Sequence, residues 1–184
     1  GYIGGLNLPI ILSWPIAGLF CGVIAFLIGK IALGLRSDYL AIATLGISEI
    51  IIYIIKNEEW LARGVKNVNG LPRPVPYEID LQKNEFIQII SNTLNLSVIE
   101  LSSLIVKGLY SILFILVLLI IFFLLQKAIK SPWGRMMRAV RDNEISAEAM
   151  GINVKKRHLQ VFIIGSAIIG ISGAMLTTLD GQFT

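Results

Sequence analysis

Residues 104–125 read LIVKGLYSILFILVLLIIFFLL, an apolar run that contains a single charged residue, Lys107. A helix rises about 1.5 Å per residue, so roughly 20 residues cross the hydrocarbon core of a membrane. A helix on the surface of a soluble protein would instead interrupt its apolar residues with polar ones at every turn. The run therefore predicts a transmembrane helix.

Three more apolar blocks extend this pattern along the chain. Residues 9–29 and 159–179 are each long enough for a span, and small residues in the second block favour close helix packing in lipid. Residues 39–55 are shorter and include Glu49, and they predict a fourth span that is complete, broken or re-entrant. We expect an all-α fold, a polytopic transmembrane helical bundle with about four spans and a short amphipathic cytoplasmic helix.

The composition agrees with a membrane-embedded chain. Hydrophobic residues make up 55% of it and charged residues 15%, and the mean hydropathy is +0.76. An ordinary soluble domain carries about 25% charged residues because its surface must face water. The chain starts at Gly1 without a Met and ends directly after an apolar block, so we expect residues 1–184 to be one transmembrane domain, truncated at both ends.

The charges of the two polar segments predict the orientation in the membrane. Residues 127–157 hold eight Lys and Arg against three Asp and Glu, whereas acidic residues outnumber basic ones in residues 57–103. Basic loops stay on the cytoplasmic side, so residues 127–157 are predicted to be cytoplasmic and residues 57–103 extracytoplasmic. The net charge of +4 lies beside the spans, where anionic lipid accounts for it, and no nucleic acid is predicted as a partner.

The predicted outer loop has internal structure. Pro72, Pro74 and Pro76 favour extended backbone, and apolar residues then recur at helical spacing between Phe86 and Leu94. This spacing indicates a helix that lies at the outer membrane face. A docking surface for a partner and a simple cover over the spans both fit such a loop.

The predicted cytoplasmic segment contains the sequence SPWGRMMRAVRDNEISAEAMGIN at residues 131–153. Ser131 before Pro132 is a helix start, and Gly151 is a helix stop. The pattern predicts a short amphipathic helix, or two with a bend near Asn143. One set of residues can face the membrane or a neighbour (Met136, Val140, Ala147 and Met150), and another projects elsewhere (Arg135, Arg138, Arg141 and Glu148). Such an element is either an anchor on the membrane surface or a part against which a motor subunit pushes.

The run from residue 130 to 153, together with GLRSDYLAIATLG at residues 34–46, resembles the permease subunits of bacterial ABC importers for branched-chain amino acids, the LivM-like branch. The resemblance implies a multi-pass transport subunit of the bacterial inner (plasma) membrane, not an enzyme. The implied partners are a second permease subunit (LivH-like), two cytoplasmic ABC ATPases, an extracytoplasmic substrate-binding protein and membrane lipid. A related urea or amide importer and an ATP-independent channel or scaffold are the alternatives.

In bacterial importers the cytoplasmic loop carries a coupling motif of the form Glu-Ala-Ala, three residues, Gly. Ala147 and Gly151 keep its spacing, whereas Ile145 occupies the position of the Glu. The resemblance therefore implies a set of residues that couple to the ATPases: Arg138, Arg141, Glu144, Ala147, Glu148 and Gly151.

Polar residues inside the fourth block mark a candidate solute pathway. Ionisable groups within a span are costly in lipid and often line a pathway or pair with a partner. Glu49 is the strongest candidate, with Thr44, Gly46 and Ser48 on the same segment. Pairing of Glu49 with a basic residue of another span or of the partner subunit fits equally well.

The sequence offers no catalytic, metal or cofactor site. It contains one His and one Cys, His158 and Cys21, which is too few for a metal cluster. No glycine-rich loop is followed by the Lys and Ser or Thr that hold nucleotide phosphates. We therefore expect another subunit to hydrolyse ATP.

Overall fold

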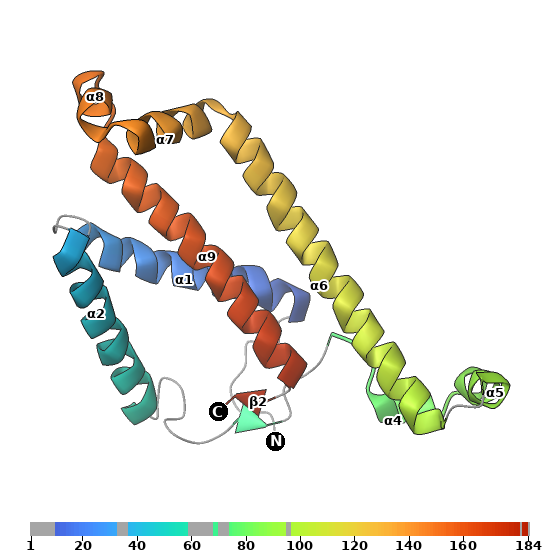
Figure 1. The fold of residues 1–184 in the computed structure, drawn as a ribbon. Helices are drawn as coiled ribbons and strands as arrows, with labels where there is room; N and C mark the ends of the chain where they lie inside the picture. Colours follow the sequence, from blue (N-terminus) through green and yellow to red (C-terminus); the bar gives the residue numbers. More distant parts are fainter. Residues whose placement is uncertain are drawn as a thin grey trace.

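The computed structural model describes residues 10–32, 37–58, 68–69, 74–94, 97–180 and 182–183. Two parts of the sequence discussed above lie outside these ranges: Pro72, and residues 34–36 at the start of the motif at residues 34–46. The all-α expectation is confirmed, because helices make up nearly all of the described chain. The elements, drawn in Figure 1, are α1 (Ile10–Ala32), α2 (Ser37–Asn57), β1 (Val68–Asn69), α4 (Glu78–Gln82), α5 (Glu85–Leu94), α6 (Val98–Lys130), α7 (Pro132–Asp142), α8 (Glu144–Ala149), α9 (Val154–Asp180) and β2 (Gln182–Phe183).

Three of the described helices are long and apolar enough to cross a membrane: Leu12–Ala32 in α1, Val98–Lys130 and Val154–Asp180. They coincide with three of the predicted spans. Large apolar side chains of α6, such as Ile115, Leu118 and Phe123, are exposed along it. Exposure of this kind is expected where lipid, not water, surrounds a helix.

The helix α6 is longer than its apolar block. It contains residues 98–103 and 127–130, and α9 contains residues 154–157, all of which composition assigned to the two loops. The physical reason is that composition shows where the lipid ends, whereas a helix continues as long as its backbone bonds and caps allow. Ser97 starts α6 with a capping box, in which its Oγ accepts from the Glu100 backbone N–H at 3.2 Å and its own N–H donates to the Glu100 carboxylate.

The helix α2 continues through Gly46 without a break. At 21 residues it is about 31 Å long, close to the thickness of a hydrocarbon core. The broken-helix alternative for this block is therefore wrong, because a glycine in a helix interior costs only about 1 kcal/mol and the nearby Ala43 and Leu45 are strong helix formers. That α2 spans the membrane stays a prediction.

The helices α1 and α9 cross in close contact (Figure 1). A Cβ placed on Gly170 would lie 2.6 Å from the Cys21 Sγ, and one placed on Gly18 would lie 2.7 Å from Ile171 Cγ1. Glycine is required at both positions because any side chain would separate the helices. The prediction of close packing by small residues is confirmed at Gly170, whereas Gly165 and Gly173 have no atoms within 4 Å of such a Cβ.

A second contact region joins α1, α6, α9 and the segment before α4. Val75, Val106 and Tyr110 form a buried cluster, and the Trp14 and Phe114 rings meet edge to face with centroids 6.4 Å apart. The Tyr110 hydroxyl donates to the Thr178 carbonyl at 3.1 Å. Side chains from distant parts of the chain thus hold the end of α9 against α6 at Tyr110.

The polar segments lie at opposite ends of the long helices. The strand β1 pairs antiparallel with β2, Val68 with Phe183 and Asn69 with Gln182, which joins the predicted outer loop to the end of α9. Figure 1 shows α4 and α5 at the start of α6, and α7 and α8 at the opposite end of this helix. The helix predicted after the prolines is confirmed as α5, where Ile87 and Ser91 are buried while Phe86 and Ile89 are exposed.

Candidate functional site

The segment that connects α6 to α9 consists of two short helices. Ser131 ends α6 and starts α7, since its hydroxyl donates to the Ala128 carbonyl at 2.6 Å and accepts from the Gly134 N–H at 3.4 Å. Asn143 separates α7 from α8. Its side chain accepts from the Ser146 N–H at 2.9 Å, and its backbone is extended, with φ −160° and ψ 108°. The predicted helix start at Ser131 and the bend near Asn143 are therefore confirmed.

A small apolar core holds the two helices together. Val140, Ala147 and Val154 pack against one another, with the half-buried Ile152 beside them. Ala147 is only 3% exposed, so its small size allows α8 to approach α7 and the start of α9. Ala147 does not contribute to the outer surface of the segment. Gly151 ends α8 with φ +84°, a left-handed conformation that disfavours side chains, and the predicted helix stop is confirmed.

The outer surface of the segment carries charge and two apolar residues. Arg138, Arg141, Glu144 and Glu148 are exposed. Ile145 is 82% exposed and Met150 85%, so Met150 remains free to face the membrane or a neighbour, whereas Val140 and Ala147 are buried. The helix α8 ends at Ala149, and Met150 follows it with an exposed side chain in the turn before Gly151. We refer to the surface formed by these six residues as the α7–α8 outer face.

Polar contacts join the two helices to the first turns of α9. The Trp133 indole Nε1–H donates to Gln160 Oε1 at 2.9 Å, and Arg157 Nη1 donates to the same oxygen at 2.9 Å. Arg157 Nη2 also lies 3.5 Å from the Met136 sulfur. His158 Nε2 lies 3.4 Å from a Glu144 carboxylate oxygen. Sequence analysis missed this role of Trp133, Arg157 and Gln160, because residues 27 positions apart share no spacing signal.

The candidate solute-pathway residues on α2 do not form one cluster. The Thr44 and Ser48 hydroxyls donate to carbonyls of their own helix, those of Ala41 at 3.0 Å and Leu45 at 2.7 Å. Thr44 and Ser48 lie one turn apart on one face, whereas Gly46 and Glu49 fall on another. Glu49 is exposed and forms no ion pair with a described residue.

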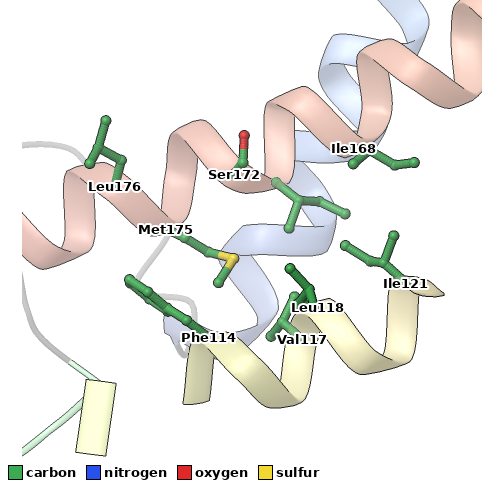
Figure 2. Close-up of a pocket in the computed structure, with 9 residues that line it drawn as sticks. Phe114, Val117, Leu118, Ile121, Ile168, Ser172, Met175 and Leu176 are labelled. Carbon is green, nitrogen blue, oxygen red and sulfur yellow. The ribbon is translucent and has the colours of Figure 1, made fainter. Parts of the chain in front are cut away.

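An apolar groove separates α6 from α9 over part of their length. Figure 2 shows Met175 of α9 extending toward Phe114 and Val117 of α6. The cavity holds about 360 Å³, and a second one of about 680 Å³ runs along α1, α6 and the segment at residues 74–76. The walls of both cavities can accept an apolar surface but offer no charged group to an amino acid. The described residues contain no group of His, Cys, Asp or Glu that could hold a metal ion.

The sequence model of one family, described as "Branched-chain amino acid transport system / permease component", matches residues 2–182. The chain belongs to this family. It is 29% identical to the high-affinity branched-chain amino acid transport system permease protein LivM of Escherichia coli, over 91% of this chain and 39% of the relative. It is 30% identical to a probable branched-chain amino acid transport permease protein LivM of Methanocaldococcus jannaschii, over 94% of this chain and 42% of that relative. No solved structure matches it.

Membership confirms the resemblance inferred from residues 34–46 and 130–153. The family comprises permease components, in agreement with a transport subunit and not an enzyme, and the three long apolar helices agree with a membrane-embedded chain. The chain spans about two fifths of the length of the curated LivM relatives that it matches.

Proposed function

We propose that the chain is part of the membrane-spanning permease subunit of an ATP-driven importer in the bacterial inner (plasma) membrane. The subunit translocates branched-chain, hydrophobic amino acids that an extracytoplasmic binding protein delivers. A LivH-like second permease subunit and two cytoplasmic ATPases complete the assembly. The family and the names of its relatives support this assignment. The 184 residues contain no phosphate-binding loop, and in this proposal the partner ATPases bind and hydrolyse ATP.

The observation that carries the proposal is the α7–α8 segment between two long apolar helices. Closure of a pair of ATPases can move a membrane helix only through an element that does not itself yield. The core of Val140, Ala147 and Val154 and the caps at Ser131 and Asn143 supply this stiffness. The charged residues and Gly151 at the end of α8 then orient the segment on the ATPase surface.

The α7–α8 outer face supplies the contact with the ATPase. Ile145 and Met150 are its exposed apolar residues, which we expect to enter apolar pockets, while Arg138, Arg141, Glu144 and Glu148 surround them. Buried apolar anchors within a polar rim contribute most of the affinity of a typical interface. In the assembly, α2 lies beside the solute path, with Gly46 and Glu49 on one of its faces and Thr44 and Ser48 on another.

The decisive experiment is reconstitution of the full-length subunit with its partners in liposomes. We expect uptake of radiolabelled leucine, isoleucine and valine that requires ATP and the binding protein, and little uptake of urea or acetamide. Uptake without ATP would show a channel, and uptake of urea or acetamide alone would show that the solute class is wrong.

The same assembly tests the docking surface. The pair Ile145→Ser and Met150→Ser removes both apolar anchors and should weaken ATPase binding by about tenfold or more, because an anchor residue is worth roughly 1–2 kcal/mol. Ala149→Ser is the matched control, since it changes an exposed residue of the same helix without removing an anchor. Unchanged co-purification of the ATPases with the double variant would contradict the role of this surface.

A further inference from the structure

We propose that Gln160 is a positioning residue which, with Trp133 and Arg157, joins α7 to α9, so that displacement of the α7–α8 segment by the ATPases becomes movement of α9. The inference rests on the proposed function and names the contact through which its mechanical step passes. The three residues, called here the Gln160 junction, lie in α7 and in the first turns of α9.

The geometry of the junction converges on one atom. The Gln160 carbonyl oxygen accepts one hydrogen bond from the Trp133 indole and one from the Arg157 guanidinium, each at 2.9 Å. The first bond crosses from α7 to α9, and the second fixes the Gln160 side chain within α9. Both bonds are part-buried, where a hydrogen bond is less exposed to competition from water. The loss of this oxygen atom would therefore remove the Trp133 hydrogen bond between α7 and α9 and leave the apolar core of Val140, Ala147 and Val154 in place.

Arg157 of α9 adds a second contact between α9 and α7. Its Nη2 reaches the Met136 sulfur of α7, and its buried Nε has no hydrogen-bond partner in the described part of the chain. A buried donor without a partner costs free energy, so this guanidinium is held in place by its contacts at Nη1 and Nη2. The bond to Gln160 is charge-assisted and about twice as strong as a neutral one.

The other polar contact between the segment and α9 is weaker. The Glu144 and His158 side chains are 61% and 41% exposed, and their nearest nitrogen and oxygen atoms lie 3.4 Å apart. Exposed ion pairs contribute between nothing and about 1 kcal/mol, because water screens them and two long side chains must be ordered. The part-buried Gln160 junction is therefore the main polar link between the α7–α8 segment and α9.

The neighbouring packing determines what the junction can move. A Cβ on Gly134 would overlap the backbone of Ile129, so α7 is tightly packed against the last turn of α6. At its own centre α9 is packed equally tightly against α1 through Gly170 and Gly18. Between α6 and α9, by contrast, lies an apolar cavity. A displacement received by α7 thus reaches α9 through the junction and carries α1 with it.

A pair of substitutions of nearly equal size tests the junction. Gln160→Met keeps the length of the side chain but has no strong acceptor, whereas Gln160→Glu keeps an acceptor oxygen. In the full-length subunit reconstituted with its partners, we measure radiolabelled leucine uptake and ATP hydrolysis together. We expect Gln160→Met to lower the leucine transported per ATP by about tenfold, the factor that corresponds to roughly 1.4 kcal/mol. ATP hydrolysis should continue, and Gln160→Glu should retain most of the ratio.

Two further variants keep the result interpretable. Gln126→Met makes the same change at an exposed position of α6 and should leave the ratio unchanged. Trp133→Phe removes the donor from α7, and it should lower the ratio with no further loss when combined with Gln160→Met. If Gln160→Met does not accumulate in the membrane, Trp133→Phe provides the measurement.

The outcomes distinguish this inference from the proposed function. An unchanged ratio in Gln160→Met or Trp133→Phe overturns the junction, and so does a parallel fall of uptake and hydrolysis. Failure of the unsubstituted assembly to take up leucine with ATP would instead refute the proposed function itself.

Discussion

At the scale of single residues, substitutions of Gly151 test the effect of its backbone conformation on stability, apart from any contact with the ATPase. Its φ is +84°, and a Cβ there would meet no atom within 4 Å, so a substitution strains the backbone without a clash. We expect Gly151→Ala to destabilise the turn between α8 and α9 by about 1–2 kcal/mol, and Gly151→Asn by less because Asn tolerates this conformation better. Thermal unfolding of the purified subunit measures the difference. Equal effects of the two substitutions would show that the conformation of Gly151 does not limit stability.

Glu49, the strongest candidate for the solute pathway, and Asp180 are both exposed carboxylates. Glu49 lies in the middle of α2, whereas Asp180 is the last residue of α9, where a carboxylate can remain in water. We expect Glu49→Gln to lower leucine uptake at least about tenfold, as loss of a charge-assisted contact would, with insertion unchanged. Asp180→Asn is the control and should retain uptake. Full uptake by Glu49→Gln would remove Glu49 from the solute pathway.

At the scale of elements, the crossing of α1 and α9 depends on where a glycine faces. Gly170 lies against Cys21, whereas Gly165 faces open space on the same helix. Gly170→Leu should lower stability by about 1–3 kcal/mol, the usual cost of overpacking, and Gly165→Leu should have little effect. The thermal midpoint of the detergent-purified subunit distinguishes them. A similar loss for both would contradict the role of the tight crossing at Gly170, because Leu in place of Gly by itself favours the helix.

At the scale of the whole molecule, the arrangement of the two ends predicts accessibility from each side of the membrane. Ile79 of α4 is 64% exposed, and Ile145 of α8 is 82% exposed at the opposite end. With Cys21 replaced by Ser, we expect a membrane-impermeant thiol reagent to label Ile79→Cys in intact cells. Ile145→Cys should be labelled only after the membrane is permeabilised. Labelling in the reverse order would invert the orientation.

Local chemistry explains why several elements could be predicted without coordinates. The run at residues 104–125 identifies a span because lipid acts on the composition of a continuous segment. Ser131, Asn143 and Gly151 mark helix ends because caps and left-handed turns depend on neighbouring backbone atoms. For the same reason the family motif could be recognised in residues 130–153, although the packing of these residues could not be predicted.

The sequence by itself determined three long apolar helices and the helix ends at Ser131 and Gly151, because each depends on residues close together in the chain. Only the tertiary structure decided that Ala147 is buried and that Ile145 and Met150 are exposed. It also decided that Gln160 accepts a hydrogen bond from Trp133. These outcomes depend on how α7, α8 and α9 pack. Contacts between residues distant in sequence leave no periodic pattern, and the packed side chains alone select them.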